Sequence, residues 1–593
     1  MEKKVLKDII ICAIVSLGLS VSYDTALKSL GMNNFTSPGD VIWLIFAISF
    51  YIIIQYYRKN VNTNKRLQIV TTIVSLIIAL LFTIGQMFTD YLLSGDNGSK
   101  KLIIYAIIKF FLYTIINKYL ISIAYSFIEK WKIQRKNKKN NLFVYNKKNF
   151  IILTIIIFIS YIPWFLNYFP GICSPDSLNQ MMQIIGVYPF TGHHPITHTA
   201  VIWLCLKIGR LISDYNAGIA IYSILQMLCC AMTFAYTVLY LDKKKVAGLI
   251  QFILLLFFMF CPIIGNYSIV MWKDIPFALC ILISTTYIVD LFTEDDFSKN
   301  KRNYFLLGLF LLLDCLFRKN GLYCIILLFV VMLFIKIENK KIVLISIVMP
   351  IIITCLFTWP ISTALDIKPG DDKEAYTVIM QQFAAVRKYH SDKLTAKEKK
   401  ELDSFFIDQT YIELYYPVFA DPVKRVFSEK YSDEHRIKMI KTYLKYMLKY
   451  PKTTIKAFIA GNYGYYYPNL VGWEVYNKID SAPQLQIKQT PIVRISIINK
   501  LNELLNNHNI PIIGVLCSCG LYALLLVFVI GYMMYKKLYK LLPSTILVIG
   551  VELTAMLSPV FCERRYVYSV YLVVPLLLAL CFSYNLNHKS NKK

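Results

Sequence analysis

Charged residues are scarce in this sequence, and the shortage limits the class of protein it can encode. Asp, Glu, Lys and Arg make up 17% of its 593 residues, and hydrophobic residues make up 56%. In soluble domains about a quarter of the residues are charged. The composition therefore excludes an ordinary soluble domain. Apolar runs near the ~20-residue length of a membrane-spanning helix predict an all-α polytopic membrane protein.

Acidic residues are scarcer than basic ones: 36 Asp and Glu stand against 64 Lys and Arg, which gives a net charge of +28. The basic clusters lie mostly in short loops between apolar runs, where cytoplasmic loops collect positive charge. The sequence also lacks a nucleic-acid-binding module. The charge therefore indicates membrane topology and contact with anionic lipids, and we expect no nucleic-acid partner.

Cysteine pairs and metal-binding spacings are missing as well. Most of the 14 cysteines lie inside apolar runs, where they behave as small apolar core residues. Residues 362–509 contain none, and Cys517 and Cys519 form a lone Cys-x-Cys motif. The pattern indicates neither a disulfide framework nor a structural zinc site.

About 14 apolar segments are predicted to cross the membrane, with both termini in the cytoplasm. The N-terminal segment has no convincing small-residue cleavage site, so we expect it to be retained as the first span. Basic loops set the direction of each segment. The predicted spans are 8–24, 41–57, 68–92, 102–127, 150–168, 216–241, 246–264, 275–293, 304–316, 322–336, 341–361, 510–534, 541–560 and 566–584.

Residues 195–213 decide this topology. They are apolar enough to cross the membrane, but Lys207 and Arg210 interrupt them, so they also fit an amphipathic helix at the outer interface. If they crossed, the basic cluster 242–245 would face outwards. The positive-inside rule favours the interfacial helix, which places the loop 169–215 outside the cell.

The predicted spans divide the chain into four parts. Within the third part, the spacing of apolar residues predicts helices at 394–403 and 429–447, with Pro451 interrupting or following the second. The parts are a four-span region with a basic cytoplasmic loop (1–149), a membrane core with the external loop (150–361), a mainly helical extracytoplasmic region (362–509) and three C-terminal spans (510–593).

The stretch 168–198 is a polar segment between long apolar runs, which makes it a candidate site. Ser174 and Pro175 predict the start of a helix, with Asp176 in its first turn. Such an acid complements the helix dipole, and a carboxylate within reach of a hydroxyl also serves as a general base. Amides at helical spacing share its face: Asn179, Gln180 and Gln183.

Three histidines follow in the same stretch. His193 and His194 precede a predicted helix, and His198 lies four residues after His194. Histidines at this spacing can bind a metal, but no matching acid is near in sequence. The pattern equally fits hydrogen bonding to a ligand or contact with a phosphate.

Further polar clusters fall on the same predicted outer side. Outward arginines oppose the positive-inside trend and suit a lipid-linked phosphate, because guanidinium groups bind such oxygens bidentately. The motif at 272–274 also fits interface anchoring by Trp272 and Lys273. The predicted substrate-binding residues from these clusters are Lys273, Asp274, Arg318, Asn320, Glu563, Arg564, Arg565 and Tyr566.

The order of these motifs resembles that of the GT-C superfamily of membrane glycosyltransferases, which includes the protein O-mannosyltransferases and the aminoarabinose transferases of lipid A. The resemblance covers about 150–584. The set of motifs looks more closely like a bacterial branch of the superfamily. A single Asp176 replaces an adjacent acidic pair, and HHPI replaces HPP. The motifs are SPDSLNQ at 174–180, GHHPITH at 192–198, WKDIPF at 272–277, FRKNG at 317–321, MQQFA at 380–384 and ERRY at 563–566.

The resemblance implies a GT-C-like bundle in a bacterial plasma membrane that moves a sugar from a polyprenyl-phosphate donor to an external glycan, lipid or protein. Asp176 would be the general base, and Lys273, Arg318 and Arg565 would hold the leaving phosphate. His193 and His194 would position donor or acceptor. The substitution of the acidic pair leaves open whether a divalent cation, Mg²⁺ or Mn²⁺, takes part. The tyrosines of 463–467 are expected to stack on sugar rings, or to form an interfacial aromatic belt.

Two other functions fit part of the sequence. A polymerase or ligase of lipid-linked glycans would also use external arginines, but it would not need the acid in the first loop. A transporter or lipid flippase would show inverted repeats with polar residues at mid-membrane. We find no such symmetry in the sequence.

Overall fold

The computed structural model describes residues 41–94, 100–135 and 143–583, together with residues 8, 10–12 and 15. Gaps within it are 365, 369, 371, 429–432, 469–474, 508–510 and 558–559. Most of the predicted span 8–24 therefore lies outside the described residues. The structure is 78% helical, and its described part contains isolated β-bridges but no strand.

Seven of the described helical segments are long and apolar enough to cross a membrane, and three shorter apolar helices accompany them. This confirms a helical membrane protein. The seven segments are α3 (Lys65–Ser94), α4 (Lys100–Arg135), α5 (Lys147–Asn167), α8 (Tyr215–Lys243), α11 (Asp274–Thr293), η6 with α25 (Tyr539–Thr545, Ile546–Met556) and η7 with α26 (Arg564–Val567, Tyr568–Cys581). The shorter ones are α9 (Gly248–Phe260), α13 (Asn320–Phe334) and α24 (Cys519–Tyr535).

Three more helices occupy predicted spans, and short elements connect the rest. The three helices in predicted spans are α2 (Val41–Asn60), α12 (Lys301–Phe317) and α14 (Lys340–Leu356). The connecting elements are α6 (Pro175–Ile184), α7 (Ile196–Ile212), α10 (Pro262–Tyr267), η1 (Phe297–Lys299), η2 (Phe357–Ile361), α15 (Ser362–Ala364), η3 (Asp372–Tyr376), η4 (Tyr463–Tyr465), η5 (Pro483–Leu485), α22 (Ser496–Asn507) and α23 (Pro511–Leu516).

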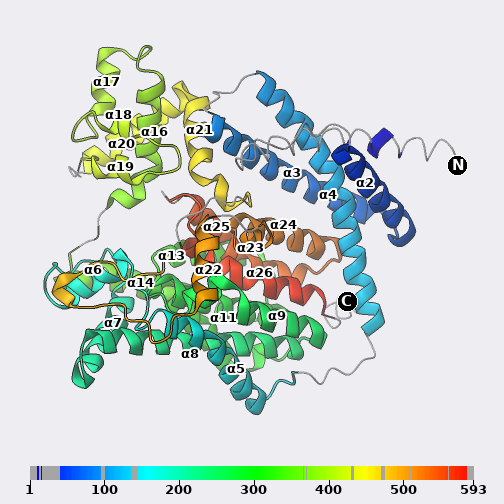
Figure 1. The fold of residues 1–593 in the computed structure, drawn as a ribbon, viewed down its shortest axis with the longest axis horizontal. Helices are drawn as coiled ribbons and strands as arrows, with labels where there is room; N and C mark the ends of the chain where they lie inside the picture. The colour runs from blue at the N-terminus through cyan, green and yellow to red at the C-terminus, as the bar shows by residue number, and fades with distance from the viewer. Residues whose placement is uncertain are drawn as a thin grey trace.

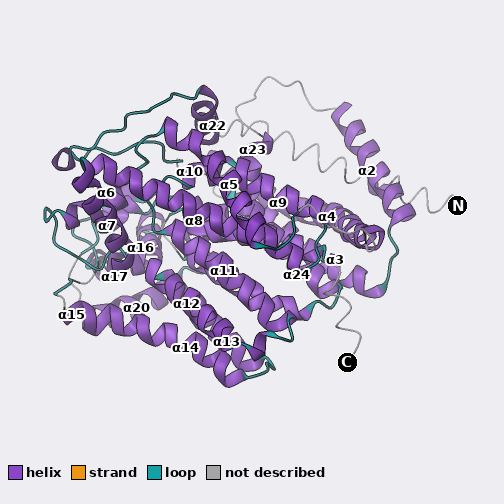
Figure 2. Cartoon of the chain, turned by 90° about the horizontal axis from the view of Figure 1, so that it is seen from below, coloured by secondary structure: helices purple, strands orange, loops and turns teal. Residues whose placement is uncertain are grey.

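The membrane core is built around α11 and α26, which pack against each other (Figures 1 and 2). Their faces are apolar almost all round, as expected for helices enclosed by other helices. Next to them, α5 packs on α8 and α13 packs on α25. The helices α2–α4 lie to one side in Figure 1 and join the core where α3 packs on α24.

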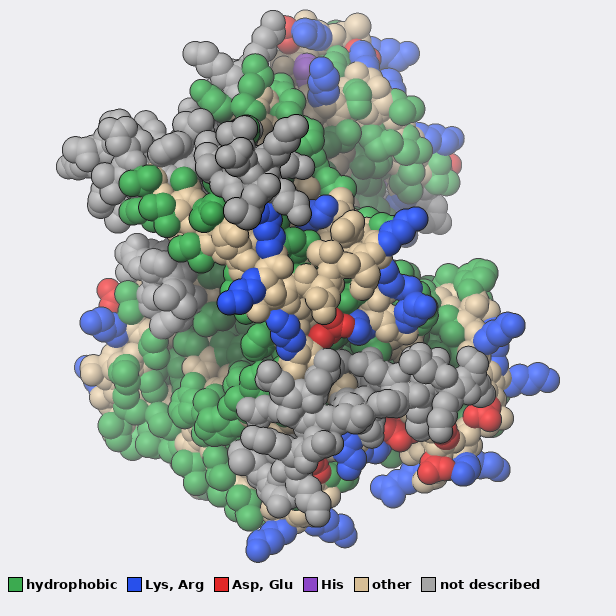
Figure 3. Space-filling model, turned by 90° about the vertical axis from the view of Figure 1, so that its right-hand side faces the viewer, with side chains coloured by type: hydrophobic (Ala, Val, Ile, Leu, Met, Phe, Trp, Pro, Cys, Tyr) green, Lys and Arg blue, Asp and Glu red, His purple; other side chains and the backbone are tan. Residues whose placement is uncertain are grey.

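One end of this core is rich in basic side chains. Figure 3 views the molecule from the side where the C-terminus lies in Figure 1, and Lys and Arg side chains gather around that face. At this end, Lys536 pairs with Glu129, and Lys244 pairs with Asp290 and Glu294. The candidate site lies at the opposite end, where α6 and α7 are found.

The predicted span 510–534 is not one continuous helix. It is divided between α23 and α24 at Cys517 and Ser518. The carbonyl oxygen of Cys517 accepts hydrogen bonds from the hydroxyl of Tyr571 (2.7 Å) and Nε of Arg564 (3.1 Å). These side chains from η7 and α26 replace the backbone donors of a continuous helix, so the break is stabilised inside the protein.

The α7–α8 hairpin depends on two glycines. A Cβ atom at Gly209 would lie 2.1 Å from the backbone nitrogen of Gly218, so the two helices meet backbone to backbone. The helix α7 coincides with the segment 195–213 that was predicted to lie at the interface. It is not among the helices of the described chain that are long and apolar enough to cross a membrane.

Gly209→Ala is therefore expected to destabilise the protein by about 1–3 kcal/mol, because the added methyl group forces the helices apart. Gly461→Ala is a matched control within another helix, since its Cβ would meet its nearest neighbour, the carbonyl of Pro417, at an ordinary 3.7 Å. Thermal unfolding in detergent measures both. Equal melting temperatures for the two variants would contradict the close approach.

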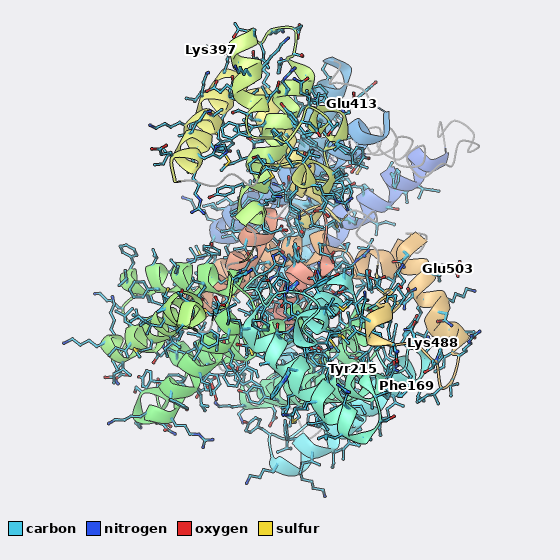
Figure 4. All side chains as sticks on the ribbon, turned by 90° about the vertical axis from the view of Figure 1, so that its left-hand side faces the viewer. Phe169, Tyr215, Lys397, Glu413, Lys488 and Glu503 are labelled. Atoms are coloured by element: carbon cyan, nitrogen blue, oxygen red, sulfur yellow. The ribbon has the colours of Figure 1, made fainter. Side chains whose placement is uncertain are left out.

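Only part of the predicted extracytoplasmic region 362–509 forms a lobe with its own apolar core, and residues 479–507 lie on the membrane core instead. Its helices surround Phe383, Phe405, Tyr411 and Phe427, and the lobe stands apart from the membrane core in Figures 1 and 4. The predicted helices 394–403 and 429–447 correspond to α17 and α20, and Pro451 begins α21. The lobe helices are α16 (Thr377–Tyr389), α17 (Ala396–Asp403), α18 (Tyr411–Leu414), α19 (Asp421–Arg425), α20 (Asp433–Lys449) and α21 (Pro451–Asn462).

After the lobe, the chain returns to the membrane core. The segment 479–493 runs along the C-terminal end of α5 and the N-terminal end of α8: the backbone nitrogen of Thr490 donates to the carbonyl of Phe169 (2.8 Å), and that of Lys488 donates to Oδ1 of Asn216 (3.0 Å). Figure 4 shows Lys488 beside Phe169 and Tyr215. The segment thereby closes one side of the region around α6.

The expectation that the tyrosines of 463–467 stack on sugars is wrong. Tyr463 and Tyr465 are buried, the ring of Tyr463 packs on Phe561, and the hydroxyl of Tyr465 donates to the carbonyl of Val560. Tyr467 packs edge-on against Phe82 of α3. These rings join the lobe to the membrane core, so their faces are already covered.

Candidate functional site

Backbone pairing brings the first acidic motif beside the second. The nitrogen of Ile172 donates to the carbonyl of Ile269 (3.2 Å), and the nitrogen of Met271 donates to the carbonyl of Ile172 (3.0 Å). These bonds fix the segment before α6 against the segment before α11. The two helices therefore begin side by side, one with Asp176 in its first turn and the other with Asp274 as its first residue.

The helix α6 begins where the sequence predicts, but its N-cap residue does not make the usual capping hydrogen bond. Ser174 is the N-cap and Pro175 is the first helical residue. The hydroxyl of Ser174 makes no bond to the helix and instead accepts from Nε1 of Trp272 (2.6 Å). This bond ties α6 to the Trp272–Asp274 motif.

Asp176 lies between two cations. Its Oδ2 is 2.8 Å from Nη1 of Arg565 and 3.5 Å from Nζ of Lys273. Burial raises the pKa of Asp176, but the charges of Arg565 and Lys273 outweigh burial, so the net pKa lies well below its ordinary range. The carboxylate is therefore ionised and ion-paired, with 32% of its side chain exposed.

Lys273 fixes the tautomer of His194. Its Nζ lies 3.2 Å from Nδ1 of His194, and because an ammonium only donates, Nδ1 is the acceptor. Burial and the charge of Lys273 lower the pKa of His194 to about 3, so the ring is neutral and carries its hydrogen on Nε2. That Nε2 is buried and has no hydrogen-bond partner within the described residues.

Arg318 and Asp274 form a second, deeper ion pair. Nη1 of Arg318 is 2.6 Å from Oδ1 of Asp274, and the exposed fractions of the two side chains are 8% and 0%. Arg318 also donates to the carbonyl of Tyr566 (3.3 Å), and its guanidinium lies 4.5 Å from the centre of the Tyr566 ring. Arg318 directly follows α12, so the pair joins the end of α12 to the start of α11, beside the turn η7.

Arg565 joins the two ion pairs into one cluster. Its guanidinium lies 4.9 Å from the ring centre of Trp272 and 5.3 Å from that of Tyr566. Glu563 caps the turn η7 by accepting from the backbone nitrogen of Arg565 (3.4 Å), and its carboxylate is 3.8 Å from Nε of the same arginine. Burial raises the pKa of Glu563.

A buried relay of polar groups supports the histidine loop. Oε1 of Gln180 lies 3.0 Å from Nδ1 of His198, and the hydroxyl of Tyr222 lies 2.8 Å from Nε2 of His198. Tyr222 donates to Gln226, whose amide bonds the carbonyls of Tyr267 and Val270. Gln180 and His198 thus hold α6, α7 and α8 together and do not open onto the ion-pair cluster.

Sequence reasoning missed Tyr222 and Gln226. Both are polar and lie four residues apart in the span α8. Polar residues inside a membrane helix usually face the bundle interior, where they find partners. Their helical spacing is the signal that would have singled them out.

Four predicted binding residues lie outside the ion-pair cluster or at its edge. Asn179 is exposed on α6, and Asn320 is half-buried at the start of α13. Arg564 is buried and donates to the break between α23 and α24, so it faces away from the cluster. His193 packs edge-on against His194, and burial together with the charge of Lys273 lowers its pKa.

The buried histidines make stability depend on pH. Burial, with Lys273, lowers the pKa of both His194 and His198 to about 3, whereas an unfolded histidine titrates near ~6.5. Between these values the unfolded chain binds more protons, so the free energy of unfolding falls on acidification, by up to about 1.4 kcal/mol per pH unit for each histidine.

We expect a lower melting temperature in detergent at pH 4.5 than at pH 7.5. His198→Gln, which keeps hydrogen-bonding groups without the titration, should reduce this difference. A wild-type melting temperature that stays constant or rises on acidification would contradict the assignment of neutral, buried histidines.

The cluster does not fit a divalent cation. No group of three or more His, Cys, Asp or Glu side chains within the described residues is arranged to hold a metal ion. Asp176 of α6 and Asp274 of α11 are already paired with cations. Lys273 occupies the only nitrogen of the His194 ring that has a lone pair to offer a metal. We therefore assign no metal to this site.

The fold and the cluster define a helical membrane protein with an ion-paired polar site at one end of its bundle. The sequence model of a family described as "Family of unknown function (DUF6020)" matches residues 185–593, and the chain belongs to this family. The match includes Lys273, Arg318 and Arg565, and it begins after Asp176. No curated protein and no solved structure matches the chain.

Proposed function

We propose that this protein is an integral membrane glycosyltransferase of the GT-C type. It moves a sugar from a polyprenyl-phosphate donor to a hydroxyl of an extracytoplasmic glycan, lipid or protein. The proposal includes about 14 spans, cytoplasmic termini and a bacterial plasma membrane. The basic face of Figure 3 supports this orientation, because it would lie in the cytoplasm and the site outside.

The observation that carries the proposal is the cluster of Asp176, His194, Lys273 and Arg565. Motifs from three distant parts of the sequence meet there, and the distances of 2.8 Å and 3.5 Å place two cations on one partly exposed carboxylate. A phosphate needs such cations, and deprotonation of a hydroxyl needs such a carboxylate.

In the proposed reaction, the acceptor oxygen attacks the anomeric carbon of the donor sugar. The bond between that carbon and the phosphate oxygen breaks, and the configuration inverts. The hydroxyl proton passes to Asp176. Lys273 and Arg565 stabilise the negative charge that develops on the departing polyprenyl phosphate. Arg318 holds Asp274 and supports the ring of Tyr566 beside Arg565, so its role is to position the site.

The test is incubation of the purified protein with polyprenyl-phosphate-linked hexoses or pentoses and cell-envelope acceptors, followed by mass spectrometry. The proposal predicts an acceptor heavier by one sugar and the release of polyprenyl phosphate. Uptake of the sugar lipid into proteoliposomes without any covalent product would contradict it and would favour a transporter.

A further inference from the structure

The charges of the cluster are balanced without a ligand. Asp176, Asp274 and Glu563 supply three carboxylates, and Lys273, Arg318 and Arg565 supply three cations. Each of these cations lies within 4 Å of at least one of these carboxylates. An incoming phosphate therefore meets cations that already have a negative partner, and it must replace one of the carboxylates.

Exposure shows which carboxylate can leave. Asp274 has no exposed side-chain surface, and Glu563 has 4%. Asp176 has 32%, and its partners Arg565 and Lys273 have 15% and 19%. A buried carboxylate cannot move away from its cation without losing all stabilisation, whereas Asp176 can turn towards water.

Two buried donors in the same cluster make no hydrogen bond among the described residues. Nε2 of His194 carries a hydrogen, and 2% of the residue is exposed. Nε of Arg565 is the second, because the carboxylate of Glu563 lies 3.8 Å away, beyond hydrogen-bond distance. Buried polar groups are normally hydrogen-bonded, so the donors of the cluster have capacity that its three carboxylates do not use.

We infer that Asp176 occupies the place of the donor phosphate in the unliganded protein and is displaced when the phosphate binds. The phosphate then pairs with Arg565 and Lys273 in place of the carboxylate. Asp176 loses both cationic partners and becomes a stronger base only when a donor is present. This inference rests on the proposed function, and it adds that donor binding switches the base on.

Displacement predicts that removal of the Asp176 charge strengthens phosphate binding. The test measures the affinity of the purified protein for polyprenyl phosphate in detergent, and in a second arm for inorganic phosphate. Asp176→Asn and Asp176→Ala are expected to bind polyprenyl phosphate about tenfold more tightly, because no carboxylate competes for the cations. The same factor is expected for inorganic phosphate at its lower affinity.

Asp296→Asn is the control for net charge, because Asp296 is exposed and pairs only with Lys299 among the described ion pairs. It should leave the affinity unchanged, and Arg565→Gln should weaken it. Equal or weaker binding of polyprenyl phosphate by both Asp176 variants would overturn the inference, as would tightening for inorganic phosphate alone. Sugar transfer by Asp176→Asn would instead overturn the proposed function, so the two failures are distinguishable.

Discussion

Asp176→Asn is expected to lower sugar transfer by about 10²–10⁴-fold, the usual contribution of a general base. The amide has the shape of the carboxylate but cannot take the proton of the acceptor hydroxyl. The measurement is the rate of product formation by the purified variant, followed by mass spectrometry at saturating donor.

The control variant is Asp296→Asn, which removes one negative charge at an exposed position. Its transfer rate should equal that of the wild type. Both variants should keep the wild-type melting temperature to within a few degrees, since 32% of the Asp176 side chain is exposed. Wild-type transfer by Asp176→Asn would remove this residue from the mechanism.

Arg318→Met is expected to destabilise the protein by about 3–5 kcal/mol, because it leaves the carboxylate of Asp274 buried without its cation. The exposed fraction of Asp274 is 0%, so water cannot replace the lost partner. Unfolding in detergent measures the loss. Transfer activity also falls, because Tyr566 loses the guanidinium that packs on it.

The double variant Arg318→Met with Asp274→Leu tests whether the loss of stability comes from the unpaired carboxylate of Asp274. Replacing both partners by apolar residues removes the uncompensated charge, so the double variant should recover most of the lost stability. Arg318→Met with wild-type stability, or a double variant no more stable than the single one, would contradict a buried structural ion pair.

Local features of the sequence predicted the helices that surround the site. Ser174 and Pro175 marked the start of α6, because proline fits the first turn of a helix, where its missing N–H has no role. The polar residues between the runs 304–316 and 322–336 marked the break between α12 and α13. Helical spacing marked α17 and α20. These signals act within a few residues, so one sequence contains them completely.

The partners within the site were beyond the same reasoning. Asp176 and Arg565 are 389 residues apart in sequence, and they meet only when the whole chain has folded. Sequence reasoning assigned Arg318 to the phosphate, but the structure gives it the fully buried Asp274 as partner. The neighbours Arg564 and Arg565 looked equivalent, yet the turn η7 sends them to opposite sides.

The composition of the sequence also could not show whether an aromatic segment forms a binding surface or a packed interface. The tyrosines of 463–467 suit either role, because an aromatic ring stacks equally well on a sugar and on another ring. Their burial against Phe561 and Phe82 depends on the return of the chain from the lobe to the membrane core. That path is a property of the whole fold.

An electron cryo-microscopy structure of the protein with polyprenyl phosphate bound would show directly where the phosphate and Asp176 lie. We expect the phosphate between Lys273 and Arg565, with the carboxylate of Asp176 turned away from both cations. A phosphate bound elsewhere, for example at Arg564 or on the lobe, with the Asp176–Arg565 pair intact would contradict this expectation.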